Sequence, residues 1–500
     1  MTTFGTTQRY VDIPREPPEE RAVQQRLHDF REIAARFSES EARRQASRCE
    51  QCGVPYCHVY CPLHNNIPDW LRLTAEGRFE EAYRLAESTN NLPEICGRIC
   101  PQDRLCEAKW ACTLEQAGHG TVTIGAVEQF LGDLAFEQGW ARPRIPRVER
   151  QHHVGIVGAG PAGLAAAEEL RARGYAVTLY DRHSLPGGLL RFGIPGFKLE
   201  KPAIDRRGQL VLDAGARFVG GFSLGRDATL AALASRHDAI LLALGAYRAN
   251  RPALPGAGER TLIDGLTYLL ASMPEPGAAL PDGVDREHLD ARGRRVIVIG
   301  GGDTAMDCVR TALRQGCLGV ICLYRRGELE RSGSRRELNK AQAEGVQILW
   351  RTETESYLPN TITMVEAAVG ACRMDEGGRL VVRRRNAAGH EIERRTVDTD
   401  MIISATGSQP ELPAAYGADG LIANENAVVQ VDPETGATNL PGVFAAGDLS
   451  RGPSLAVWAI RDGRAAAAGI HGYLCAGTEE APRKRPVREP FARFAAASAE

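Results

Sequence analysis

The sequence lacks a long apolar run, has few aromatic residues and carries almost no net charge. Of its 500 residues, 43% are hydrophobic and 6% aromatic, and the formal net charge is −2. No stretch approaches the roughly 18 apolar residues of a membrane helix, and residues 1–20 are polar and proline-rich, unlike a secretory signal. No basic excess favours nucleic acid. We therefore expect a cytoplasmic protein that binds neither membrane nor nucleic acid.

Glycine and cysteine, by contrast, are abundant. The 53 glycines suit nucleotide-binding turns better than a disulfide-rich or all-β secreted fold. Eight of the 13 cysteines fall between Cys49 and Cys112, and the other five are spread from Cys308 to Cys475. In a reducing compartment such clustering favours metal ligation over disulfides.

Three regions follow one another along the chain. Residues 1–147 are predicted to be helical, with helices over 19–47 and 69–87. From residue 153, short β-branched runs alternate with glycine turns and alanine-rich helices, which is typical of parallel α/β units. We expect α/β domain segments at 148–255, 285–408 and 409–475, and a loose tail at 476–500. The predicted fold class is α/β, with two dinucleotide-binding units after an N-terminal helical domain.

The first dinucleotide fingerprint occupies residues 154–164. A short apolar strand runs into G-A-G-P-A-G, starting at Gly158, and then into an alanine-rich helix. Gly158 permits a tight turn, Gly160 lets the backbone approach a pyrophosphate, and Gly163 allows close helix–strand packing. A second strand over 176–180 ends in Asp181, whose carboxylate can accept from a ribose hydroxyl. The candidate contacts are Gly158, Gly160, Pro161, Ala162, Gly163, Asp181 and Arg182.

Two other segments identify the dinucleotide. Residues 442–448 form an apolar strand that closes in Gly447-Asp448, with a helix expected over 455–468. This resembles the FAD-binding closure of two-dinucleotide flavoproteins, and the turn at 187–191 resembles the one beside their flavin. A helix N-terminus there would offer positive potential to reduced flavin. The resemblance adds Gly188, Leu189, Arg191, Gly407, Gly447, Asp448, Ser454 and Leu455 to the FAD candidates.

A second fingerprint, G-G-G-D-T-A, follows an apolar strand and starts at Gly300. The next strand, over 320–324, ends in Arg325-Arg326 instead of an acid. Two guanidiniums can bind a 2′-phosphate, which predicts NADPH over NADH, and Arg335-Arg336 adds charge nearby. The alternative is a solvated basic stretch. The NADPH candidates are Gly300, Gly302, Asp303, Thr304, Ala305, Arg325 and Arg326.

Residues 242–245 and 402–407 resemble the strands by which such flavoproteins leave and re-enter the FAD domain. The NADPH domain, at 285–408, would then be inserted between the FAD-binding parts at 148–255 and 409–475. That arrangement brings the nicotinamide near the flavin for hydride transfer.

The clustered cysteines form two runs, Cys49-x2-Cys52-x4-Cys57-x3-Cys61-Pro and Cys96-x3-Cys100-Pro-x4-Cys106-x5-Cys112. Runs that end in Cys-Pro are typical of iron–sulfur proteins with two clusters, in which the last cysteine of a run often serves the other cluster. Zinc ligation and unligated thiols are the alternatives, but only one C-x2-C occurs and the remaining spacing is irregular for zinc knuckles.

Several motifs resemble the small subunit of bacterial NADPH-dependent glutamate synthases: C-E-Q-C-G-V-P-Y-C from Cys49, I-C-G-R-I-C-P-Q-D-R-L-C-E from Ile95, H-G-T-V-T-I-G from His119, G-G-G-D-T-A-M-D-C from Gly300 and G-S-R-R-E from Gly333. The resemblance covers about residues 30–475. It implies two interleaved 4Fe–4S clusters, with Cys96 unligated. Their ligands would be Cys49, Cys52, Cys57 and Cys112 for one, and Cys61, Cys100, Cys106 and Glu128 for the other. The spacing from Cys106 to Cys112 is two residues longer than usual in the family.

The same resemblance implies a function. Electrons from NADPH would pass through FAD and the clusters to a large FMN subunit with glutaminase and synthase sites, which makes L-glutamate from L-glutamine and 2-oxoglutarate. The only C-x2-C or C-x4-C pair beyond residue 112 is Cys317-x4-Cys322, expected to be structural, so disulfide exchange is not expected. Two alternatives stay open: a related reductase that feeds another acceptor, and a zinc-stapled nucleotide-binding regulator.

Overall fold

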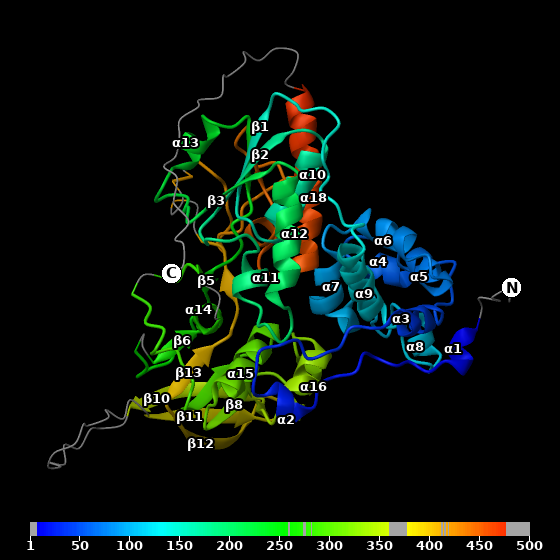
Figure 1. The fold of residues 1–500 in the computed structure, drawn as a ribbon. Coiled ribbons are helices and arrows are strands. Elements are labelled where there is room, and N and C mark those ends of the chain that lie inside the picture. The colour runs from blue at the N-terminus through cyan, green and yellow to red at the C-terminus, as the bar shows by residue number, and fades with distance from the viewer. Residues whose placement is uncertain are drawn as a thin grey trace, which may run out of the picture.

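The computed structural model describes residues 8–476 except 259–260, 274–276, 282, 360–377, 412–413, 415–416 and 419. The predicted tail therefore lies outside the described residues, apart from Ala476. A helical part lies beside two α/β parts that each have a parallel sheet (Figure 1). No helix in the described part of the chain combines the length and apolarity needed to cross a bilayer.

The helical part packs around the buried side chains of Trp70, Leu71 and Phe130. Helices α7 and α9 approach so closely that a Cβ on Gly97 would lie 2.4 Å from the backbone nitrogen of Gln129. The helices are α1 (Arg9–Asp12), α2 (Val23–Arg26), α3 (Glu39–Ala46), α4 (Tyr56–Tyr60), α5 (Ile67–Glu76), α6 (Phe79–Glu87), α7 (Pro93–Ile99), α8 (Thr113–Gln116) and α9 (Ile124–Glu137), with a 3-10 turn at Gln102–Arg104.

The helix predicted over 19–47 is wrong for most of its length. Only α2 and α3 are helical there, and α3 begins at a capping box formed by Ser38 and Glu41. The segment between them runs along the α/β parts, where the backbone nitrogen of Ile33 donates to the carbonyl of Phe197 at 3.3 Å. These tertiary contacts override the local helix propensity. The helix predicted over 69–87 is two helices, because Gly77 ends α5 with φ +83°.

The first parallel sheet has the strand order β15-β4-β1-β2-β3. Helices α10, α12 and α18 lie side by side on one face of it (Figure 1). Its apolar strands and these helices form one buried core, as the β-branched runs predict. The elements of this part are β1 (His153–Val157), α10 (Pro161–Ala172), β2 (Ala176–Asp181), α11 (Leu189–Phe192), α12 (Lys201–Asp213), β3 (Arg217–Gly220), α13 (Leu230–Ala234), β4 (Ala239–Leu242), β15 (Val443–Ala445), α17 (Asp448–Arg451) and α18 (Ala456–Ala476).

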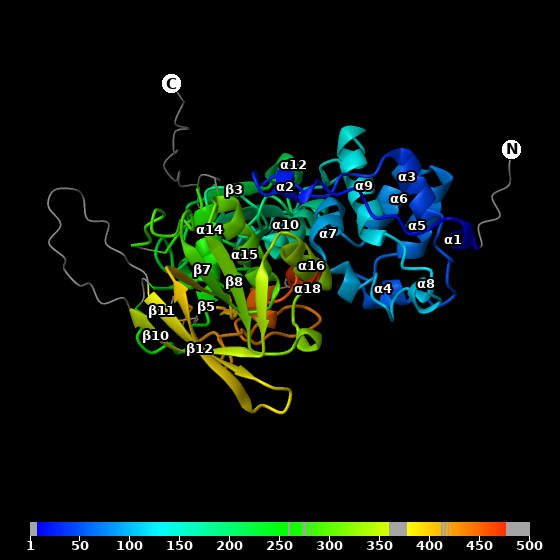
Figure 2. The ribbon, with the colours of Figure 1, turned by 90° about the horizontal axis from the view of Figure 1, so that it is seen from below.

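The second parallel sheet has the order β6-β13-β7-β8-β9. A three-stranded antiparallel sheet, β10-β11-β12, lies beyond it at the opposite end of the molecule from α1 and α3 (Figure 2). The elements here are β6 (Leu262–Asp264), α14 (Gly265–Ser272), β7 (Arg295–Ile299), α15 (Asp303–Gln315), β8 (Gly319–Tyr324), a 3-10 turn at Glu328–Glu330, α16 (Arg335–Ala343), β9 (Gln347–Trp350), β10 (Thr352–Pro359), β11 (Gly378–Arg385), β12 (Glu391–Thr399) and β13 (Met401–Ser404).

The second sheet comes from chain that lies between β4 and β15 of the first. The chain crosses between the two parts on an antiparallel pair of short strands, β5 (Arg248–Ala249) and β14 (Ser408–Gln409). The inserted part starts earlier than the predicted boundary at 285, because β6 and α14 already belong to it. A three-residue strand beside a Pro- and Gly-rich stretch carries too little apolar pattern to be seen in the sequence.

Candidate functional site

The first glycine turn connects β1 to α10 and leaves its backbone uncovered. Gly158 has φ +110°, and a Cβ there would lie 2.1 Å from the carbonyl oxygen of Ala243. Gly160 caps α10 and faces Gly188, on which a Cβ would lie 2.8 Å from the Gly160 Cα. A side chain at Gly158 would therefore collide with the backbone of Ala243, whereas one at Gly160 or Gly188 would narrow the gap at the helix N-terminus, where a pyrophosphate can bind.

An open cavity of about 320 Å³ starts at this turn and extends between the two α/β parts. Asp303 and Thr304 of the second part also line it, so it is shared by both parts. The predicted FAD residues in its wall are Gly158, Gly160, Pro161, Ala162, Asp181, Arg182, Gly188, Leu189, Gly447, Asp448, Ser454 and Leu455.

Asp181, which lines the cavity, accepts hydrogen bonds from two backbone nitrogens. One carboxylate oxygen accepts from the backbone nitrogen of Ala159 at 2.6 Å and the other from that of His183 at 2.8 Å. Burial raises the pKa of Asp181. Since a carboxylate can accept about four hydrogen bonds, capacity for a ribose hydroxyl remains. The guanidinium of Arg182 lies 4.6 Å above the ring of Tyr247, which also lines the cavity.

The Gly447-Asp448 turn and the start of α18 form another part of the cavity wall, and a Cβ on Gly447 would lie 3.1 Å from the Cβ of Ala162. Asp448 accepts from the backbone nitrogen of Ser454 at 3.0 Å and from its hydroxyl at 3.1 Å. Burial raises the pKa of Asp448 to about 6. Leu455 and Val457 bring the N-terminal end of α18 to the wall, where its dipole favours negative charge.

Three predicted FAD residues lie outside this wall. Gly163 has a packing role, since a Cβ there would lie 1.8 Å from the carbonyl oxygen of Gly158. Arg191 is buried, pairs with Asp205 and donates to the carbonyl of Pro186 at 3.0 Å. Gly407 has φ +103° beside the β5–β14 crossing.

The second glycine turn repeats the geometry of the first. Gly300 has φ +144°, and a Cβ there would lie 2.3 Å from the carbonyl oxygen of Ala405. Gly302 caps α15, which begins at Asp303 and Thr304, and the backbone nitrogen of Ala305 donates to the Gly302 carbonyl at 3.1 Å. The N-terminus of α15 is therefore positioned for a second pyrophosphate.

Arg325 and Arg326 follow β8 directly and are exposed. No hydrogen bond or ion pair joins either guanidinium to another residue that the structure describes, although Arg326 lies 5.5 Å from the ring centre of Tyr324. The pair is therefore available to an anionic ligand. Arg336 was expected to add positive charge near this pair, but its guanidinium contacts the cysteine-rich part instead.

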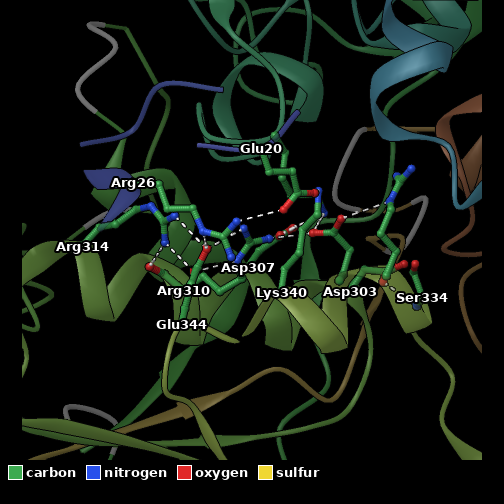
Figure 3. A network of polar contacts seen from close by, with 12 residues as sticks. Glu20, Arg26, Asp303, Asp307, Arg310, Arg314, Ser334, Lys340 and Glu344 are labelled. Atoms are coloured by element: carbon green, nitrogen blue, oxygen red, sulfur yellow. Dashed lines mark hydrogen bonds and ion pairs between the residues drawn. The ribbon is translucent and has the colours of Figure 1, made fainter. Parts of the chain in front are cut away.

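A polar network joins the N-terminal segment to both α/β parts (Figure 3). The ammonium of Lys198, in the first part, lies 2.9 Å from Asp307 and 3.7 Å from Glu337 in the second. Burial opposes its charge, but these carboxylates raise the pKa of Lys198 overall. Arg26 of the N-terminal segment pairs with Glu344 at 3.0 Å. The α/β parts are thus tied together beside the shared cavity.

The eight clustered cysteines divide into two groups that cross the sequence runs. The inner group lines one small cavity and consists of Cys61, Cys96, Cys100 and Cys106, together with Glu128. The outer group consists of Cys49, Cys52, Cys57 and Cys112. Burial raises the pKa of Cys49, Cys57 and Cys112, and the charge of a neighbouring cysteine of the group adds to this effect. The structure therefore brings together every predicted metal ligand in one group or the other.

Asn90 holds the polar side of the inner cavity. Its amide nitrogen donates to Glu128 at 2.9 Å, and its amide oxygen lies 3.6 Å from the sulfur of Cys96. Burial raises the pKa of Glu128 to about 8. A buried carboxylate beside three or four thiols is costly unless a positive centre compensates for it.

The buried thiols also need a positive centre if they are to ionise. Burial raises the pKa of Cys49, Cys57 and Cys61 to about 12, and it raises the pKa of Cys106 far above its usual value. Such thiols ionise only when a metal supplies positive charge. No three His, Cys, Asp or Glu side chains in the described ranges lie close enough to share one metal ion. The donor set, which is rich in thiols, fits an iron–sulfur cluster, because such clusters are held by thiolates.

Cys100 lies where the two cavities meet. It lines both the dinucleotide cavity and the inner cysteine cavity, and Val457 of α18 does the same. A group bound by Cys100 would therefore be the direct neighbour of a group bound beside α18.

Comparison with known proteins identifies these parts. Residues 26–140 match the family model described as dihydropyrimidine dehydrogenase domain II, 4Fe–4S cluster, and residues 152–463 match the pyridine nucleotide-disulphide oxidoreductase model. The chain is 49% identical to the glutamate synthase [NADPH] small chain of Azospirillum brasilense, over 94% of this chain and 97% of that one. The chain belongs to the glutamate synthase small-chain family.

A second small chain of that family, from Escherichia coli K12, is 40% identical over 93% of this chain and 98% of its own length. Among solved structures, Mycobacterium tuberculosis FprA in complex with NADPH matches with a TM-score of 0.52 and 17% identity, covering 66% of this chain and 86% of that one. The latter match shows the fold alone.

These findings confirm the predicted family and the α/β fold with two dinucleotide-binding units and an iron–sulfur domain. The protein is an NADPH-dependent oxidoreductase with an electron-transfer role. Sequence reasoning missed Tyr247, Lys198 and Asn90, which shape the site of this small chain. Tyr247 follows the β4 turn at Gly245 and could have been found there, but isolated Lys and Asn residues carry no pattern.

Proposed function

We propose that this chain is the electron-input subunit of a glutamate synthase, which draws electrons from NADPH and delivers them to a large FMN subunit. That partner would use them to convert L-glutamine and 2-oxoglutarate into two molecules of L-glutamate. FAD, when bound, supplies the step from a two-electron donor to one-electron acceptors. The other steps of the proposal concern the residues of this chain.

The FAD residues are those of the shared cavity, with Asp181 toward the ribose and Asp448 toward the phosphate arm. The N-terminus of α18 faces the region where negative charge develops on reduction. NADPH lies along the N-terminus of α15, and Arg325 and Arg326 bind its 2′-phosphate. Asp303 and Thr304 reach the FAD cavity, which supports direct hydride transfer within it.

Two 4Fe–4S clusters complete the proposal. The outer cluster takes Cys49, Cys52, Cys57 and Cys112. The inner cluster takes Cys61, Cys100 and Cys106, with Glu128 as its fourth ligand and Cys96 unligated. Asn90 orients Glu128, as partners of metal ligands commonly do.

The observation that supports this route most directly is the position of Cys100 in the walls of both cavities. It makes the inner cluster the neighbour of the flavin. The outer cluster would then be the exit toward the partner subunit. Exposed apolar side chains gather on the chain segments near the outer cysteines: Val54, Tyr56, Val59, Tyr60 and Trp110.

An anaerobic visible spectrum of the purified chain tests the proposal. We expect flavin bands above a broad iron–sulfur absorbance that NADPH bleaches. In Cys100→Ser, NADPH should still reduce the flavin while the inner cluster is lost, and Cys475→Ser, at an exposed cysteine of α18, should match the wild type. A colourless, zinc-containing chain would refute the proposal. Co-expression with the large subunit should give glutamine-dependent NADPH oxidation. If glutamine does not support NADPH oxidation but ferredoxin accepts the electrons, the alternative reductase is favoured.

A further inference from the structure

The G-S-R-R-E motif at 333–337 lies in the NADPH-binding part but faces the cysteine-rich part. Arg336, in the first turn of α16, donates from Nη1 to the side-chain oxygen of Gln102 at 2.7 Å. Its Nη2 donates to the carbonyl oxygen of Cys100 at 3.2 Å. One guanidinium therefore contacts both the backbone of a cysteine that lines the flavin cavity and the side chain two residues further on.

Gln102 is held in one orientation. It is buried, and its amide nitrogen donates to the carbonyls of Cys96 at 3.2 Å and Gly97 at 2.9 Å. Gly125 leaves no freedom on the other side, since a Cβ there would lie 2.3 Å from this nitrogen. With its nitrogen committed to two carbonyls, Gln102 can only present its oxygen to Arg336. The contact is therefore specific.

Neighbouring residues strengthen the junction. Asp103 accepts from the hydroxyl of Ser334 and from the backbone nitrogen of Arg335, both at 2.9 Å. The backbone nitrogen of Ser334 in turn donates to Asp303 at 2.8 Å, at the start of α15. Figure 3 shows Asp303 and Ser334 at one end of the polar network. The cysteine loop is thus fixed to the second nucleotide-binding turn.

The charge of Arg336 acts on a site that is otherwise anionic. In the proposed ligation, three thiolates and the carboxylate of Glu128 surround the inner cluster, and an added electron increases this negative charge. Net charge and hydrogen bonds near the ligands set the potential of such clusters. The side chain of Arg336 is 38% exposed and its Nε lies 3.6 Å from Oε1 of Glu337, so solvent and this carboxylate weaken its field without removing it.

We propose that Arg336 is a positioning residue for electron transfer, which holds the Cys100–Gln102 loop and raises the reduction potential of the inner cluster. This inference rests on the proposed function, which places a cluster on Cys61, Cys100 and Cys106. In the step concerned, one electron passes from reduced flavin to the inner cluster, and no bond forms or breaks. The guanidinium favours the product because it compensates for the added negative charge.

The test is an EPR-monitored redox titration of the full chain, reconstituted with iron and sulfide under nitrogen. In Arg336→Gln we expect the equilibrium constant for reduction of the inner cluster to fall about tenfold, which is a shift of about 59 mV for one electron. Arg336→Lys keeps the charge but not the two hydrogen bonds, so the potential of its inner cluster should lie between those of the wild type and Arg336→Gln. Arg335→Gln, which removes a neighbouring exposed charge, should leave the potential of the inner cluster unchanged. The potential of the outer cluster should stay the same in every variant.

An unchanged inner potential in an iron-replete Arg336→Gln chain overturns the inference. If that variant does not retain iron, Arg336→Lys decides: a potential below wild type supports the inference, and the wild-type value overturns it. Absence of iron and sulfide from the wild-type chain would instead overturn the proposed function. The rate of flavin reduction by NADPH, followed at the flavin band, should not change in Arg336→Gln, because hydride transfer precedes the step that Arg336 affects.

Discussion

A buried ion pair joins the cysteine-rich part to the FAD-binding part, and its removal should be among the most costly single changes in the molecule. Arg207 of α12 donates from Nε to Oε1 of Glu94 on α7 at 2.9 Å and from Nη2 to Oε2 at 2.8 Å. The two side chains are 1% and 0% exposed. Arg207 also lies 5.0 Å from the ring centre of Phe136. Helix α7 ends just before Cys100, so this pair holds the inner cysteines against the FAD part.

Arg207→Met should destabilise the chain by about 3–5 kcal/mol, because it leaves the carboxylate of Glu94 buried without its partner. Replacing both residues, as in Arg207→Met with Glu94→Leu, should recover most of that loss, since a buried pair is often no more stable than an apolar one. The double-mutant cycle isolates the coupling between the two side chains. Chemical denaturation, followed by circular dichroism, gives each free energy of unfolding.

The exposed pair of Arg84 and Glu80 on α6 is the control. Nη2 of Arg84 lies 2.7 Å from Oε1 of Glu80, but the two side chains are 53% and 47% exposed, respectively. Arg84→Met should therefore cost less than about 1 kcal/mol. The reasoning is refuted if Arg207→Met costs no more than this control, or if the double variant is as unstable as the single one.

Three further outcomes are expected. Glu128→Ala should lose the iron of the inner cluster, whereas Cys96→Ala should retain it, as iron analysis and EPR would show; the reverse result would make Cys96 the ligand. Arg325→Ala combined with Arg326→Ala should lower kcat/KM for NADPH by about 100-fold or more and leave that for NADH unchanged, since each guanidinium would lose a charge-assisted hydrogen bond that contributes about 1.5–3 kcal/mol. Burial lowers the pKa of His237 to about 3. His237 therefore binds a proton more tightly in the unfolded chain than in the folded one. Its contribution to the free energy of unfolding is present above about pH 6.5 and falls by about 2 kcal/mol by pH 5. Denaturation of His237→Gln above about pH 6.5 and at about pH 5 should show a smaller loss of stability.

The strand-turn-helix patterns predicted the two nucleotide-binding turns because each pattern is contained in a short stretch of sequence. Gly158 and Gly300 have positive φ, and each faces the carbonyl oxygen of the residue just after a neighbouring strand, so only glycine fits. The acid after β2 and the two arginines after β8 were likewise readable, since each follows its strand directly. The residues of each pattern lie within about 25 positions of one another, although the carbonyl oxygens that require glycine, those of Ala243 and Ala405, lie much further along the chain.

Long-range contacts account for what the sequence did not predict. The segment before α3 has helix-forming composition, yet Arg26 and Ile33 lie against parts of the chain more than 150 residues away. Arg336 was expected near the nucleotide phosphate, because adjacent arginines give no sign of which partner each one faces. Its true partners, Gln102 and Cys100, are more than 230 residues away.

The shared cavity explains why one arrangement of the parts can serve both electron entry and electron exit. Thr304 of the NADPH-binding part, Asp448 of the FAD part and Cys100 of the cysteine-rich part line the same space. A donor at the first, a carrier at the second and an acceptor at the third would all be neighbours, so no rotation of the NADPH-binding part is needed between hydride transfer and electron release. The ties through Lys198 and Arg336 hold that part in place on two sides. They would oppose such a rotation, because each contact that it broke would leave a buried charge or hydrogen-bonding group without its partner.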